Sequence, residues 1–84
     1  MEHELKCNPE YFSRIAMRQK TFEIRKNDRD YQVGDTLILR EYDPKTGRVL
    51  YGVDDMLVAK VVYITSYEQK DGYVVMGIEV QNDQ

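Results

Sequence analysis

Lys20, Glu23 and Arg25 place two cations and a carboxylate within one short segment of the chain. The segment alternates apolar with polar residues, which is typical of a β-strand. Because neighbouring side chains in a strand point to opposite faces, we expect Phe22 and Ile24 to face the core. Thr21, Glu23 and Arg25 should point together the other way. A carboxylate held between two cations on one face indicates a polar site.

The first chemistry that fits this cluster is ligand binding. Lys20 and Arg25 would hold a phosphate through charge-assisted hydrogen bonds, while Glu23 would accept from an exocyclic amine or orient Arg25. An aromatic side chain such as Tyr31 or Tyr63 would stack a base. The cluster therefore predicts a site for RNA or for a small nucleotide-like ligand.

The second chemistry is hydrolysis. Lys20 would act as a general base that activates Thr21 or a water molecule, and Glu23 would position it. The simplest alternative to both is structural, because Glu23 could pair with Arg25 or Lys20 on a solvated sheet face, where such an ion pair contributes about 0 to 1 kcal/mol.

Charge along the chain is unevenly distributed. The protein carries a net charge of -3, which argues against a surface coated with phosphate contacts to a long duplex. Residues 14–29, in contrast, contain six cations and only two acids. This basic segment favours a local anionic ligand and adds three further candidate binding residues: Arg18, Lys26 and Arg29.

The scarcity of metal ligands excludes several classes of protein. Cys7 is the one cysteine and His3 the one histidine, so the sequence predicts neither a disulfide nor a zinc site, and we expect no metal and no cofactor. Cys7 is expected to pack as a small hydrophobe, and Asp35 to bind nearby backbone amides as an anchor. The apolar runs are too short for a membrane span, which predicts a soluble, cytoplasmic protein.

The pattern of elements predicts a single domain over residues 1–84 of the α+β class, a small mixed β-barrel with an early helix. Asn8 as a cap and Pro9 in the first turn start the helix, which we expect to run to about Gln19. Five strands are predicted: His3–Cys7, Thr21–Lys26, Thr36–Tyr42, Val58–Thr65 and Tyr73–Val80. The inward faces of the last two are expected to carry Val58, Val62 and Ile64, and Val74, Met76, Ile78 and Val80.

The segment that ends in Lys20, Thr21, Phe22, Glu23, Ile24 and Arg25 resembles the G-x-K-x-x-E-x-R signature of ASCH domains, small β-barrels of the PUA-like superfamily. Further stretches resemble an ASCH-like branch of unknown function that occurs in phages and bacteria: residues 3–6, 25–30, 33–37 and 71–78. The resemblance covers nearly the whole chain. It implies a PUA-like barrel that binds RNA through a cleft bordered by Lys20, Glu23 and Arg25.

Two departures from the ASCH pattern bear on function. Gln19 stands where the signature has Gly, and a positive φ there would cost of order 1 kcal/mol or change the turn. Relatives that hydrolyse an acylated cytidine use a Thr three residues after the Lys, whereas this chain has Glu23 at that place. We therefore expect RNA or nucleotide binding first, a nucleoside amidohydrolase second, and a phage-type protein-interaction module third.

Overall fold

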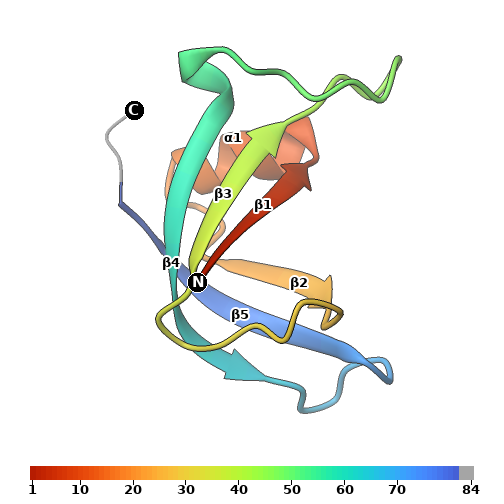
Figure 1. Cartoon of the computed structure of the whole chain (residues 1–84), viewed down its shortest axis with the longest axis vertical. Coiled ribbons are helices and arrows are strands. Elements are labelled where there is room, and N and C mark those ends of the chain that lie inside the picture. The colour runs from red at the N-terminus through yellow and green to blue at the C-terminus, as the bar shows by residue number, and fades with distance from the viewer. Residues whose placement is uncertain (82–84) are drawn as a thin grey trace.

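The computed structural model describes residues 1–81, which form one curled five-stranded sheet and a single α-helix (Figure 1). The strand order is β1-β3-β4-β5-β2; β1 and β3 run parallel, and the other neighbours are antiparallel. A mixed, half-closed sheet with an early helix confirms the predicted α+β class. The elements are β1 (Glu2–Cys7), α1 (Pro9–Ala16), β2 (Phe22–Lys26), β3 (Thr36–Glu41), a 3-10 turn η1 (Val53–Asp55), β4 (Met56–Thr65) and β5 (Tyr73–Val80).

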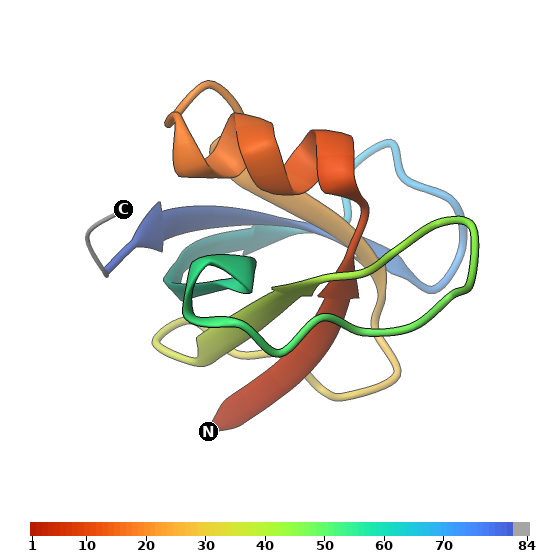
Figure 2. The same cartoon turned by 90° about the horizontal axis from the view of Figure 1, so that it is seen from above.

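The core fills the concave side of the curled sheet, and α1 lies across it (Figure 2). Alternate residues of each long strand point inward, as the period of a strand requires. The helix contributes Phe12 and Ile15 to the same core. The buried apolar residues from the strands and loops are Leu5, Cys7, Tyr31, Leu37, Leu39, Leu57, Ala59, Val61, Val74, Met76 and Ile78.

The inward face of β5 is confirmed, but the predicted face of β4 is wrong. Val62 is 47% exposed, whereas Leu57, Ala59 and Val61 are fully buried. A bulge between Val61 and Tyr63 shifts the register, so that Ile64 packs against the core beyond it. Because this strand carries apolar residues on both faces, its sequence pattern does not indicate which set faces inward.

Helix α1 begins as predicted and ends earlier. The Asn8 side chain accepts a hydrogen bond from the Glu10 backbone N–H at 2.9 Å. At the other end, Arg18 adopts a φ of 62°, and the Gln19 N–H donates to the Arg14 carbonyl at 2.8 Å, which is the geometry of a Schellman motif. The helix therefore stops at Ala16, and the residue with positive φ is Arg18 rather than Gln19.

Arg25 on β2 and Arg29 in the loop after it both bond β1, the opposite outer strand, which does not pair with β2. Arg25 Nη2 donates to the Lys6 carbonyl at 2.7 Å, and Arg29 Nη1 donates to the Glu4 carbonyl at 3.0 Å. Lys6 and Glu4 are two residues apart on β1, so both carbonyls face the same open edge. These bonds close part of the seam between the two edge strands.

Asp35 anchors the start of β3, as predicted. Its Oδ2 accepts from the Gln32 backbone N–H at 3.0 Å and contacts His3 Nε2 at 2.8 Å, while Oδ1 pairs with the Met1 amino group at 3.2 Å. The His3 hydrogen bond is the main cause that lowers the pKa of Asp35. The anchor thus holds the N-terminal strand to the loop before β3.

Candidate functional site

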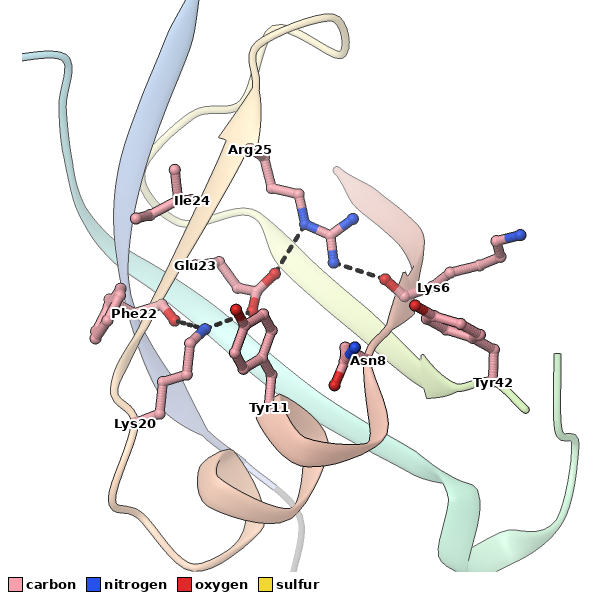
Figure 3. Close-up of a pocket in the computed structure, with 9 residues that line it drawn as sticks. All are labelled: Lys6, Asn8, Tyr11, Lys20, Phe22, Glu23, Ile24, Arg25 and Tyr42. Carbon is pink, nitrogen blue, oxygen red and sulfur yellow. Dashed lines mark hydrogen bonds and ion pairs between the residues drawn. The ribbon is translucent and has the colours of Figure 1, made fainter. Parts of the chain in front are cut away.

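A pocket of about 610 Å³ lies between β1, β2 and the first turn of α1 (Figure 3). The first turn of α1 forms one wall and β2 forms another. The pocket is lined by Lys6, Asn8, Tyr11, Lys20, Phe22, Glu23, Ile24, Arg25 and Tyr42. The three residues of the predicted cluster therefore meet in a concave site and do not spread over a flat face.

Strand β2 is turned over relative to the sequence prediction. Glu23 is 3% exposed, whereas Phe22 and Ile24 are 40% and 50% exposed. The register explains the reversal, because Glu23 is paired with Met76, whose side chain is fully buried in the core. The prediction that Phe22 and Ile24 face the core is wrong; the charged residues occupy the inward face.

Glu23 lies between the two cations with both oxygens bonded. Lys20 Nζ is 3.0 Å from Oε1, and Arg25 Nε is 2.8 Å from Oε2. A buried carboxylate is unfavourable unless it is paired and hydrogen-bonded, and these two contacts meet both needs. The pairing is more buried than the surface ion pair considered from the sequence, since the Glu23 side chain is 4% exposed.

Lys20 is fixed by three kinds of contact. Besides Glu23, its Nζ donates to the Phe22 carbonyl at 2.7 Å. The same ammonium lies 4.8 Å from the ring centroid of Tyr11 and 4.7 Å from that of Phe22. These are cation–π distances, so the aromatic rings favour the charged amine at the pocket wall.

Hydrogen-bond donors remain free at the pocket after these contacts are formed. Arg25 uses Nε for Glu23 and Nη2 for the Lys6 carbonyl, and its Nη1 has no hydrogen bond within residues 1–81. The Lys6 ammonium lies 5.7 Å from the ring centroid of Tyr42. The pocket thus combines available cationic donors with aromatic surfaces, a set suited to an anionic group attached to a planar ring.

Three of the other predicted site residues lie outside this pocket. Arg18 donates to the Ala16 carbonyl at 2.6 Å and, with Thr21, lines a separate hollow of about 130 Å³. Lys26 is exposed at the end of β2 and does not line the pocket. Thr21 is therefore not placed to act as a nucleophile inside the larger pocket.

The predicted site residues Tyr31 and Arg29 also lie outside the pocket. Tyr31 is 4% exposed, and its ring packs edge-on against His3 at a centroid distance of 4.7 Å. It has no free face on which a base could stack. Arg29 does not line the pocket and instead bonds the edge of β1.

The sequence analysis missed six residues of the pocket: Lys6, Asn8, Tyr11, Phe22, Ile24 and Tyr42. Lys6 had a recognisable signal, because it is an outward-facing cation on the first predicted strand. Tyr11 also had one, since it lies on α1 beside the cap. Tyr42 enters the site only through the pairing of β1 with β3, which places it next to Cys7. Nothing local in the sequence reveals that contact.

Cys7 lies beneath the pocket as a buried thiol. Burial, followed by the negative charge of Glu23, raises the pKa of Cys7 to about 12. The thiol therefore stays protonated at neutral pH, which is the opposite of a catalytic cysteine. Residues 1–81 contain no group of three or more His, Cys, Asp or Glu side chains able to hold a metal ion, and no helix in this range could cross a membrane.

All residues that line the pocket lie within a segment that matches a known protein family. The model of the domain of unknown function DUF3850 matches residues 2–78, which include all pocket residues. A relative from Escherichia phage P2, "Uncharacterized 12.9 kDa protein in GpA 3'region", is 48% identical over 40 residues. That match covers 48% of this chain and 37% of the relative.

Proposed function

The chain belongs to the DUF3850 family, and we propose that it binds single-stranded RNA or a nucleotide in the pocket between β1 and β2. The observation that carries this proposal is the convergence of Lys20, Glu23 and Arg25 in a concave, aromatic-lined site. A flat arrangement of the same charges would have supported only a solvated ion pair.

Each group has a definite role in the proposed complex. Arg25, through its free Nη1, and Lys6 contact a phosphate. Tyr11 or Tyr42 provides the ring on which a base stacks. Glu23 orients the two cations, because each of its carboxylate oxygens accepts a hydrogen bond from one of them.

The local geometry also fits an ASCH-like assignment of the family. In the G-x-K-x-x-E-x-R signature the Gly lies two residues before the Lys, which is the place of Arg18. Arg18 has a φ of 62°, a conformation that glycine adopts readily. The departure from the signature is therefore at Arg18, and the chain accommodates it by forming the helix C-cap with a non-glycine residue.

Hydrolysis is less well supported than binding. Thr21 lines a separate hollow and not this pocket, so hydrolysis in the pocket would require a water molecule as the nucleophile. Lys20 is held by two hydrogen bonds to oxygen, which suits a fixed cation better than a base that must accept a proton.

The proposal is tested by fluorescence anisotropy with a short labelled single-stranded RNA. Lys6→Ala and Arg25→Ala should each weaken binding about tenfold or more, because these two cations contact the phosphate and a hydrogen bond to a charged group contributes about 1.5 to 3 kcal/mol. Lys60→Ala is the matched control, because Lys60 is an exposed cation on β4 outside the pocket.

Three results would lead away from RNA binding. Equal losses in all variants would indicate nonspecific charge attraction. Turnover of an acylated cytidine that is lost in Lys20→Ala would establish the hydrolase instead. If neither substrate responds, a protein partner becomes the better explanation.

A further inference from the structure

The outer edge of β2 carries backbone groups that the sheet does not use. The Ile78 N–H donates to the Thr21 carbonyl at 3.0 Å, and the Asn27 N–H donates to the Gly72 carbonyl at 2.8 Å. Odd-numbered residues of this segment therefore direct their backbone groups toward the β5 side. By alternation, the N–H and C=O groups of Phe22, Ile24 and Lys26 point away from β5, toward the open seam.

Two of the three outward carbonyls are already occupied. Lys20 Nζ donates to the Phe22 carbonyl at 2.7 Å, and the Asp28 N–H donates to the Lys26 carbonyl at 2.9 Å (Figure 3 shows the first). Ile24 lies between them and lines the pocket. Neither its N–H nor its C=O has a hydrogen-bond partner within residues 1–81.

The Ile24 C=O is therefore the one outward carbonyl of β2 that is left free within residues 1–81. An added peptide strand would need a row of free acceptors as well as donors, and the bonds to the Phe22 and Lys26 carbonyls remove two of the three acceptors. One donor beside one acceptor does match a single planar edge. Each nucleobase presents an adjacent donor and acceptor on its Watson–Crick edge when it is not base-paired.

We propose that Ile24 reads the Watson–Crick edge of one unpaired base through its backbone N–H and C=O. This inference rests on the proposed nucleotide-binding function and defines the ligand more narrowly, as an unpaired nucleotide. Arg25 follows Ile24 directly and carries the free Nη1, so the phosphate and the base of one nucleotide are bound by adjacent residues. A duplex is rejected, because pairing occupies the edge that Ile24 needs.

The inference is tested by ¹H–¹⁵N NMR titration with the four nucleoside 5′-monophosphates and with ribose 5-phosphate, which lacks a base. A nucleotide should shift the Ile24 amide proton downfield, while the Phe22 and Lys26 amides on the same edge serve as internal controls. Ribose 5-phosphate should shift Arg25 and leave the Ile24 amide in place. A nucleotide that shifts Arg25 without shifting Ile24 would overturn the inference.

Ile24→Pro supplies a second readout, because it removes this N–H and an edge strand tolerates Pro where the N–H faces outward. The variant should bind nucleotides about tenfold more weakly and bind ribose 5-phosphate as the wild type does. If the wild type binds ribose 5-phosphate as tightly as the nucleotides, base reading fails while anion binding stands. If the wild type binds neither these probes nor single-stranded RNA, both the inference about Ile24 and the proposed function fail.

Discussion

Replacing Glu23 by Gln should destabilise the protein strongly, although the change removes only a charge. Gln can accept from one cation with its Oε1, but its NH₂ group then faces the donor of the other. Lys20 Nζ at 3.0 Å and Arg25 Nε at 2.8 Å would thus exchange two charge-assisted bonds for one neutral acceptor. Breaking a buried pair in this way leaves cations without a counter-charge.

The size of the effect follows from burial. Loss of a partner in a fully buried pair costs about 3 to 5 kcal/mol, but the Lys20 and Arg25 side chains are 15% and 26% exposed, so water screens part of the loss. We expect about 2 kcal/mol. In a domain of this size, that corresponds to a fall in Tm of about 8 to 16 °C.

Urea unfolding followed by far-UV circular dichroism measures this change. Glu79→Gln is the matched control, because it is the same substitution at an exposed position of the neighbouring strand β5. We expect it to lower the free energy of unfolding by about 0.5 kcal/mol or less. If Glu23→Gln and Glu79→Gln unfold at the same urea concentration, the buried ion cluster described here contributes nothing and the reasoning is refuted.

Three further predictions concern other groups. The pKa of Asp35 is lowered in the folded protein, so its contribution to stability is present above about pH 4 and is lost as the pH falls through the folded pKa. The urea midpoint of Asp35→Asn should therefore fall less steeply below about pH 4 than that of the wild type. An unchanged slope would exclude Asp35 as the cause of the fall. The pKa of Glu41 is raised, first by burial and then by Asp55, so the wild type loses stability as the pH rises through that pKa. Glu41→Gln should therefore gain stability relative to the wild type between about pH 4 and pH 7. A difference in urea midpoint between the two proteins that stays constant with pH would contradict this. Cys7, with a pKa of about 12, should react with a thiol reagent at pH 8 only after unfolding, and rapid labelling of the folded protein would show that it is accessible.

Much of the architecture was predictable because it depends on local pattern. The cap at Asn8 and Pro9, the alternation in β5 and the anchor at Asp35 each follow from the chemistry of neighbouring residues. The end of α1 was not predicted, because arginine rarely adopts the left-handed conformation that Arg18 has here.

The orientation of β2 was mispredicted because a buried charge cluster overrides its apolar pattern. The rule that apolar side chains face the core assigns Phe22 and Ile24 inward, yet the register with β5 turns Glu23 inward instead. Burial of Glu23 becomes acceptable only through Lys20 and Arg25. Local rules are expected to fail at functional sites, where charge is retained against the preference of the core.

The site was found in part because its charged residues are close in sequence. Its other wall comes from Lys6 and Tyr42, which tertiary pairing of β1 and β3 brings to the pocket. Two candidates lie elsewhere in the fold: Arg29, from the basic segment, bonds the edge of β1, and Tyr31, the candidate stacking residue, is part of the core.

The central claim is that the pocket between β1 and β2 binds a single-stranded RNA. The most direct test of this claim is an NMR titration with a short single-stranded RNA. The titration follows chemical-shift changes of the backbone amides and of the Arg25 Nε–H. The predicted perturbations are confined to residues 6–11, 20–25 and 42. A different hollow is lined by Asn27 and by residues of the loop before β5. Shifts centred on that hollow, or no shifts at all, would contradict the account.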